Sequence, residues 1–232
     1  MELLEQLLTL EQYKNKIEIV IVDGGSNDGT LKYLQKQTYC NNWVSEKDKG
    51  IYDAMNKGIN MSNGKYLWFL NSGDFAYNQS SIDKVLECID NNADAIYGET
   101  MLVDEHFKEI GLRSIKTTRK LPETLNWKSF QYGMNVGHQS FIIKKSLTTN
   151  YNTEYKHVAD IDWMIQCLKK CKATINTHQV ISCFTLDGHS TKYRNESNKE
   201  RYLVLKKHYG FIPNFFNHVY IFIRSLLNSS KI

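Results

Sequence analysis

The stretch Ile17–Thr30 reads IEIVIVDGGSNDGT, and it decides the fold class. Its first six residues are apolar and β-branched apart from one glutamate, which predicts a short buried strand. The next eight residues contain three glycines and predict an irregular loop. A helix is expected after the loop, with Leu31 and Leu34 facing inward. A strand, a loop and a helix in this order are typical of an α/β domain.

The same alternation continues on the C-terminal side of this stretch. Gly50–Met61 places apolar side chains on one face and predicts an amphipathic helix. Tyr66–Leu70, YLWFL, predicts a second buried strand that runs into the loop Asn71–Asp74. Further elements are expected as helices at Ser81–Asn91, Val158–Cys171 and Lys199–His208, strands at Ala95–Tyr97, Ser140–Ile143 and Gln179–Phe184, a hairpin around Asp104-Glu105, and a chain break at Pro213. We therefore predict an α/β fold with a mostly parallel central sheet and flanking helices.

Size and composition limit the classes of protein to consider. The chain has 232 residues, of which 41% are hydrophobic, and a formal net charge of +4. Its lysines and arginines are scattered, so we predict no nucleic-acid partner. We recognise neither a signal peptide nor a run of about 20 apolar residues, and therefore expect a cytoplasmic protein.

The five cysteines predict no disulfide framework. Their number is odd and no CxxC motif occurs, so reduced core cysteines are the favoured interpretation. Cys167 and Cys171 are four residues apart and could supply half of a zinc site, which is the alternative.

Two acidic residues follow directly on predicted strands. Asp23 ends the first strand and Asp74 closes the loop after YLWFL. Ligands of open α/β sheets bind beyond the carboxyl ends of the strands, so these acids indicate a site. Each acid could instead only cap the helix that follows, which would contribute about 1 kcal/mol.

Several motifs together resemble a known family. VDGGSNDGT at Val22–Thr30 and SEKDKGIYDAMNKGINMSNGKYLWFLNSGD at Ser45–Asp74 resemble the donor-binding half of family 2 glycosyltransferases. The resemblance covers roughly residues 1 to 195 and implies the GT-A fold of nucleotide-diphospho-sugar transferases. GIYDAMNKG and NSGD are similar to segments of enzymes that assemble colanic acid, O-antigen and capsule. The implied activity is inverting transfer of a sugar from a UDP or GDP donor to a hydroxyl of a bacterial surface-polysaccharide intermediate.

The resemblance implies a donor site in the first loop. Asp23 would accept a hydrogen bond from an N–H of the nucleotide base, with Gly25 in the same loop. Many family members have a second acid where this chain has Gly24. The loop does not fit a calcium site, because the sixth position of such a loop is glycine and is Asp28 here.

The resemblance also implies a metal ion. Asn71–Asp74 takes the place of the family's DxD-type motif, so Asp74 would bridge Mn²⁺ or Mg²⁺ to the donor diphosphate. Asn71 replaces the first acid of that motif, which removes one charge and predicts weaker metal binding. The alternative is that NSGD is only a polar turn.

A catalytic base is implied in the segment His157–Trp163. Asp160 matches the acid that takes the proton of the acceptor hydroxyl, and Asp162 is the fallback base. Asp160 begins a predicted helix, whose dipole favours the ionised carboxylate. An acid at this position is also a common helix cap, and that alternative stays open.

Three weaker segments complete the implied site. The donor side would include Asp53, Asn56 and Lys57 on the helix after Gly50, whose alternative is a solvated face with one Asp–Lys pair. The acceptor side would include His138 and Gln139, although a lone histidine is more often structural.

The third segment is Asp187–Thr191, DGHST, which matches a loop that closes over the diphosphate. Within it, His189 replaces a usual glycine and is expected to touch phosphate or metal.

We predict one GT-A domain at residues 1–210 and an apolar tail at residues 211–232. The family's first strand, which precedes the helix at residues 2–12, has no counterpart, so we expect either a true start that lies upstream or an N-terminally truncated domain. A sugar-nucleotide-binding remnant without activity is therefore the rival function. A nucleotidyltransferase would need a Gly/Arg/Lys-rich N-terminal loop, and we find none.

The tail contains NFFNHVYIFIRSLL at Asn214–Leu227. It predicts either peripheral contact with the inner face of the cell membrane, near a glycan or lipid-linked glycan acceptor, or packing on the domain itself or on a partner chain.

Overall fold

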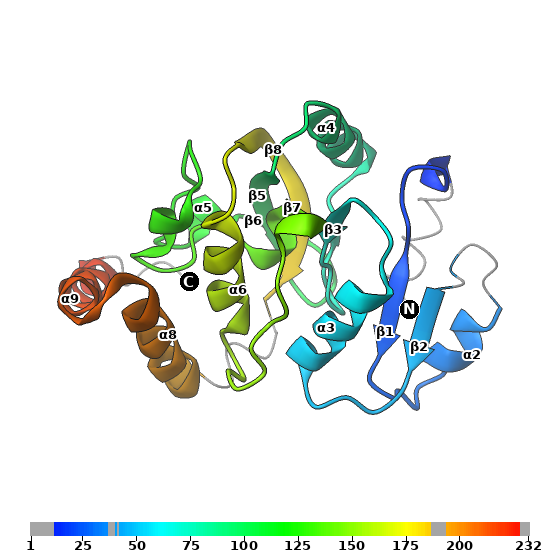
Figure 1. Ribbon diagram of the computed structural model, residues 1–232, viewed down its shortest axis with the longest axis horizontal. Coiled ribbons are helices and arrows are strands. Elements are labelled where there is room, and N and C mark those ends of the chain that lie inside the picture. Colours follow the sequence, from blue (N-terminus) through cyan, green and yellow to red (C-terminus); the bar gives the residue numbers. More distant parts are fainter. Residues whose placement is uncertain (1–11, 37–39, 41, 187–193, 228–232) are drawn as a thin grey trace.

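The computed structural model describes residues 12–36, 40, 42–186 and 194–227, and the chain folds into a mixed α/β structure (Figure 1). Its strands are β1 (Val20–Asp23), β2 (Asn42–Ser45), β3 (Tyr66–Trp68), β4 (Phe75–Ala76), β5 (Ala95–Val103), β6 (Glu109–Leu112), β7 (Phe141–Lys144) and β8 (Thr174–Thr185). The helices are α2 (Thr30–Leu34), α3 (Ile51–Met61), α4 (Gln79–Asp90), α5 (Arg113–Lys116), α6 (Ala159–Leu168), α8 (Arg194–Tyr209) and α9 (Phe211–Leu227). Short 3-10 turns lie at Trp127–Phe130, His138–Ser140 and Lys145–Leu147.

The strands form two sheets. β1 and β2 pair in parallel, and the larger sheet has the order β3-β7-β5-β8-β4 with β6 on the side of β5. No pairing between described residues joins the two sheets. In the larger sheet only β5 and β8 are parallel. The prediction of a mostly parallel sheet is therefore wrong for its strand directions, although the alternation of strands and helices is confirmed.

Two local features account for three of the four antiparallel pairs between described strands. The expected hairpin around Asp104 is present, because its side chain accepts hydrogen bonds from the N–H groups of His106 and Lys108 and closes the turn between β5 and β6. β7 follows a 3-10 turn and enters between β3 and β5 in the opposite direction to both. Neither feature is a helical crossover, and only a crossover returns a strand in parallel.

The chain does not break at Pro213. The break lies at Gly210, whose φ of 86° is favourable for glycine, and Pro213 occupies the first turn of α9. A proline is tolerated there because the N–H groups of the first turn have no partner inside the helix.

The main core fixes α3 against α6, and this contact positions the candidate site. Tyr52 of α3 stacks on Tyr151 with ring centroids 5.7 Å apart, and Tyr151 stacks on Trp163 of α6 at 4.6 Å. All three side chains are buried. In Figure 1, α3 lies between the β1–β2 sheet on one side and α6 on the other.

The five cysteines are free thiols, as expected, and Cys171 donates to the carbonyl of Cys167. The described residues hold no group of three or more histidine, cysteine or acidic side chains that could bind a metal ion, so the zinc alternative gains no support. None of the helices in the described ranges combines the length and apolar character needed to cross a bilayer.

Candidate active site

Asp23 ends β1 and its carboxylate is held by the loop that follows. It accepts hydrogen bonds from the N–H groups of Gly25 at 3.2 Å and Ser26 at 3.0 Å. The hydroxyl of Ser45 donates to it at 2.6 Å, because Ser45 is the residue opposite Asp23 in the parallel register of β1 and β2. Burial raises the pKa of Asp23, but the bonds from Ser26 and Ser45 outweigh burial and hold the pKa below its usual value. The carboxylate is therefore ionised at neutral pH and can only accept hydrogen bonds.

Two glycines let this loop approach the neighbouring one. Gly25 has a φ of 90°, which side chains rarely adopt. A Cβ atom on Gly24 would lie 2.6 Å from Oδ2 of Asp48. The family's second acid is missing at position 24, but the carboxylate of Asp48 lies close to that backbone from the loop after β2. Sequence reasoning missed both Ser45, which ends β2, and Asp48, which lies in the loop that follows.

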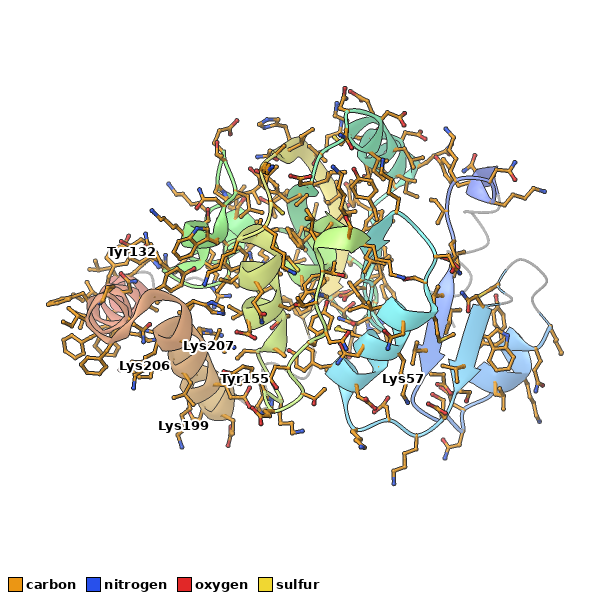
Figure 2. The ribbon with its side chains drawn as sticks, in the orientation of Figure 1. Lys57, Tyr132, Tyr155, Lys199, Lys206 and Lys207 are labelled. Carbon is orange, nitrogen blue, oxygen red and sulfur yellow. The ribbon has the colours of Figure 1, made fainter. Side chains whose placement is uncertain are left out.

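The first turns of α3 border the same loops. Lys57 forms an ion pair with Glu46 at 2.7 Å and lies 3.8 Å from Asp53. Asp53 accepts the backbone N–H of Lys49 at 3.0 Å. Figure 2 shows Lys57 on the part of α3 that faces the β1–β2 sheet. Lys57 and Asp53 therefore lie beside the loop after β2, and their contact with the donor stays a prediction.

Asn56 lies on the opposite side of α3 and has a structural partner. Its amide donates to the carbonyl of Tyr151 at 3.0 Å, and its carbonyl oxygen accepts the N–H of Tyr151 at 2.7 Å. Both ends of the side chain are thus used to hold the loop after β7. This arrangement favours a structural role for Asn56 over the predicted donor contact.

Asp160 lies in the first turn of α6 and faces α3. Its Oδ1 atom accepts the hydroxyl of Tyr52 at 3.2 Å and the N–H of Ile161 at 2.9 Å. Burial raises the pKa of Asp160 above its usual value, while these two hydrogen bonds and the charge of Arg201 oppose that rise. A carboxylate whose proton affinity is raised in this way is suited to act as a general base.

Asp162 faces α8 instead. Its fully buried carboxylate accepts hydrogen bonds from His208 at 2.7 Å, Lys207 at 3.1 Å and Gln166 at 2.7 Å. Burial raises the pKa of Asp162, but these donors outweigh burial and the net pKa is lowered. The arrangement favours a structural ion pair, so the predicted role of catalytic base stays with Asp160.

Asp160 interacts electrostatically with Arg113, Arg119 and Arg201, and sequence reasoning missed all three. Burial lowers the pKa of Arg113 to about 10, and the charges of Glu99 and Asp160 oppose this. Burial together with the charges of Arg113 and Arg201 lowers the pKa of Arg119 well below its usual value. The guanidinium of Arg113 donates to the backbone carbonyls of Asn135 and Met134, and an anion bound nearby would relieve the repulsion among these cations.

Asp74 lies in a tight turn that is anchored on β8. Its N–H donates to the carbonyl of Asn71 at 2.9 Å, and its carboxylate accepts the N–H of Asn71 at 3.2 Å. Thr185 of β8 donates to the carbonyl of Gly73 at 2.7 Å. Burial raises the pKa of Asp74 to about 7, since its only opposing partner is Asn71.

These surroundings fit a metal ion that is held largely by the donor. Asp74 is 3% exposed, and no cation among the described side chains offsets its charge. A divalent ion would do so, and Mg²⁺ commonly uses one or two carboxylates together with substrate phosphates. Asp74 would supply the protein's oxygen ligand, and the ion would neutralise charge that develops on the leaving diphosphate.

The predicted acceptor-side residues lie in the core. His138 is 5% exposed, and its Nε2 is 2.8 Å from the hydroxyl of Tyr151. Burial lowers the pKa of His138 to about 4, so the ring is neutral at physiological pH. Gln139 is also buried, and its carbonyl accepts the indole N–H of Trp68 at 2.8 Å. His189 lies outside the described residues.

The structure links Asp23 and Asp160 through α3. Asp23 accepts a hydrogen bond from the hydroxyl of Ser45, and the next residue, Glu46, forms an ion pair with Lys57 of α3. On the other side of α3, the hydroxyl of Tyr52 donates to Asp160. Asp74 has no hydrogen bond or ion pair to Asp23 or Asp160 in the described part of the chain. Two of the three predicted acids thus flank one helix, and joining the third to them stays a prediction.

Comparison with known proteins gives one family. The family model described as Glycosyl transferase family 2 matches residues 2–149. A PGL/p-HBAD biosynthesis glycosyltransferase of Mycobacterium bovis is 26% identical over 183 residues, which cover 74% of this chain and 66% of the relative. Chondroitin synthase of Escherichia coli is 30% identical over 115 residues, which cover 48% of this chain and 14% of the synthase.

Among solved structures, S. aureus TarS 1-349 has a similar fold. Its complex with UDP-GlcNAc has a TM-score of 0.64 and 17% identity, over 88% of this chain and 59% of TarS. Its complex with UDP has a TM-score of 0.65 over the same shares of the two chains. This chain therefore spans about two thirds or less of the length of these proteins.

Proposed function

Because the chain belongs to glycosyl transferase family 2 and has the GT-A fold, we propose that it transfers a sugar from a nucleotide-diphosphate donor, UDP or GDP, to an acceptor hydroxyl. The family and the fold expected from the motifs are confirmed. The link between Asp23 and Asp160 through α3 is the observation that carries the proposal. It places the ionised carboxylate of Asp23, a hydrogen-bond acceptor, on one side of α3 and the candidate catalytic base Asp160 on the other side.

In the proposed reaction Asp23 accepts an N–H of the nucleotide base, and Gly25 leaves room for the donor in the loop. Asp160 takes the proton of the acceptor hydroxyl as its oxygen attacks the anomeric carbon, and the bond to the diphosphate breaks on the opposite face. This displacement inverts the anomeric centre, and its transition state has oxocarbenium character. Tyr52 keeps the Asp160 carboxylate oriented toward α3.

The diphosphate needs positive charge as it leaves. Asp74 would hold Mn²⁺ or Mg²⁺ against it, in keeping with the buried carboxylate described above. Further positive charge on the side of Asp160 comes from Arg113, Arg119 and Arg201. We propose that His189 contacts the diphosphate.

For the acceptor, we propose a bacterial surface-polysaccharide intermediate, free or lipid-linked, that the protein reaches from the cytoplasm. The support comes from the name of the mycobacterial relative, a biosynthesis glycosyltransferase, and from the chondroitin synthase. His138 and Gln139 are too buried to touch this acceptor directly, so we assign the His138 ring to holding Tyr151 and the backbone carbonyl of Gln139 to holding Trp68.

A rival proposal is a binding protein without turnover. It is favoured by Asn71, which supplies no charge, and by the lack of a three-ligand metal group among the described residues. Both proposals predict binding of a sugar nucleotide, and only the first predicts its consumption.

Donor hydrolysis separates the two proposals. UDP- and GDP-sugars are incubated with the full chain with and without Mn²⁺, the released diphosphate is measured, and NMR gives the anomer of the sugar product first formed. We expect Mn²⁺-dependent release with inverted configuration for one donor. Binding without release would support the rival, and a retained anomer would contradict the inverting mechanism.

A further inference from the structure

Helix α9 carries most of the exposed apolar surface of the described chain. Ten of the thirteen large apolar side chains that are exposed there belong to it. They are Phe211, Ile212, Phe215, Phe216, Val219, Tyr220, Phe222, Ile223, Leu226 and Leu227. Their spacing repeats at three and four residues, so they form one continuous apolar face. A face of this size on a surface helix indicates an interaction site.

The helix is docked on the domain through its polar side. Asn214 is fully buried and donates to the carbonyl of Tyr202 on α8 at 3.1 Å. Arg224 donates to the carbonyl of Tyr132 at 3.0 Å, and the ring of His218 lies 4.9 Å from the ring of Tyr202. Surface helices normally turn their apolar side inward. Here the orientation is reversed, so packing on its own domain does not explain the apolar side of α9.

The charges around the apolar face are positive. α9 contains no acidic residue. On α8, Lys199, Leu203 and Lys206 lie on one stripe of the helix, and all three are exposed. The Lys206 ammonium lies 5.5 Å from the ring centroid of Phe211, so this stripe adjoins the apolar face. Figure 2 shows Lys199 and Lys206 pointing outward, away from the central sheet.

The acids of α8 leave the charge of Lys206 in place. Glu200 is turned toward the loop before α6, where it accepts the N–H groups of Lys156 and His157 at 2.9 and 2.8 Å. Glu196 lies in the first turn of α8, three residues before Lys199 and at the far end from Lys206, so it offsets part of the charge of Lys199 and leaves that of Lys206.

We propose that α9 lies flat on an anionic lipid surface, with its apolar face among the acyl chains and the lysines of α8 at the headgroups. An apolar helix face rich in Phe, Leu and Ile and bordered by lysines is the usual composition of an interfacial helix. A second copy of the chain fits less well, because a protein interface needs about one hydrogen bond per 100–200 Å² and this face offers one polar side-chain atom, the Tyr220 hydroxyl.

The length of the helix suits this position. Its 17 residues extend about 25 Å. The proposal makes the predicted membrane contact of the tail specific. The α9 helix lies in the plane of the membrane, and its polar side attaches the rest of the domain to the helix. The proposal does not depend on glycosyl transfer, because it is measured without donor.

Vesicle binding of the full chain tests it. The protein is sedimented with vesicles of phosphatidylglycerol or of phosphatidylcholine at low salt. We expect at least tenfold stronger partition to phosphatidylglycerol. The double variant Phe216→Glu/Phe222→Glu should lose at least tenfold of that partition. Ile115→Glu is the matched control, since Ile115 is equally exposed on α5, and it should bind as wild type.

The lysines give an independent measurement. Lys199→Gln and Lys206→Gln should each weaken binding to phosphatidylglycerol about fivefold and leave binding to phosphatidylcholine unchanged. Light scattering after gel filtration measures whether the chain forms a dimer, in which a second copy would cover the apolar face of α9. The proposal is overturned if the chain ignores both vesicles, if the phenylalanine variant binds them as wild type does, or if a dimer forms without lipid and Phe216→Glu dissolves it.

Discussion

Replacing Tyr52 by phenylalanine should raise the pKa of Asp160 and shift the acid limb of the pH–rate profile to higher pH. The hydroxyl donates to Oδ1 of Asp160 at 3.2 Å, which is beyond the usual O–H···O distance. A hydrogen bond to a charged group contributes about 1.5–3 kcal/mol, and the long distance favours the lower end. Since about 1.4 kcal/mol corresponds to one pKa unit, the variant should raise the pKa of Asp160 by about one unit.

The direction of the rate change follows from the role of a base. Asp160 works when it is ionised, so the rate falls as the pH falls through its pKa. In Tyr52→Phe this fall should begin about one unit higher, which makes the variant about tenfold slower on the acid limb and similar to wild type on the plateau. Initial rates of donor consumption across the acid and neutral range measure it.

Tyr66→Phe is the control for this experiment. It removes a phenol hydroxyl that donates to the carbonyl of Ala93 at 2.6 Å, so it loses a hydrogen bond of the same kind away from Asp160. Its acid limb should coincide with that of wild type. If the limb of Tyr52→Phe also stays in place, Asp160 does not titrate as the base and the assignment is wrong.

Four further predictions concern Asp160, Asp162, the Asp23 loop and the metal ion. Asp160→Asn should abolish turnover yet unfold at the same or a higher temperature near pH 8, because a raised folded pKa means that wild-type stability declines as the pH rises through it. Asp162→Asn should instead lower the free energy of unfolding by about 3 kcal/mol near neutral pH. The lowered pKa of Asp162 means that the ionised carboxylate stabilises the fold above the unfolded pKa, and this stabilisation is lost on acidification. Chemical denaturation measures the difference, and equal stability of the two proteins would contradict the ion-pair role. Ser45→Ala removes one hydrogen bond to Asp23 and should weaken binding of the sugar nucleotide about fivefold, as measured by calorimetry. Unchanged affinity would contradict a contact between the Asp23 loop and the nucleotide base. Chelation by EDTA should stop donor consumption, reversibly by Mn²⁺, without moving the melting temperature, because no preformed three-ligand metal group exists in the described residues; a large drop in melting temperature would mean a structural metal instead.

The sequence predicted the elements that local pattern determines. Periodicity identified α3 and α6, and the strand end at Asp23 pointed to the loop that we propose for the donor. The same logic could have found Ser45, because the residue at the end of a neighbouring parallel strand lies beside the first.

Roles that depend on distant partners were out of reach. Asn56 looked like a site residue, but its partner Tyr151 is 95 positions away along the chain. Asp160 and Asp162 look equivalent in sequence, yet two residues on a helix differ by about 200° around the axis, so one faces α3 and the other α8. The arginines at 113, 119 and 201 form no local motif, and only tertiary structure brings their charges to Asp160.

The orientation of α9 could not be predicted for the same reason. An amphipathic sequence shows that a helix has two faces, and the buried partners decide which one turns inward. Here Asn214 and Arg224 find backbone carbonyls on the domain, and these contacts settle the direction.

A titration of isotopically labelled protein with a UDP- or GDP-sugar, followed by amide resonances, examines whether one ligand is held by both sides of α3. The amides of Gly25 and Ile161 report on Asp23 and Asp160, because each N–H donates to the respective carboxylate. Both resonances should shift in parallel and saturate at a single dissociation constant. A titration that moves only one of them, or neither at saturating donor, would contradict the shared site.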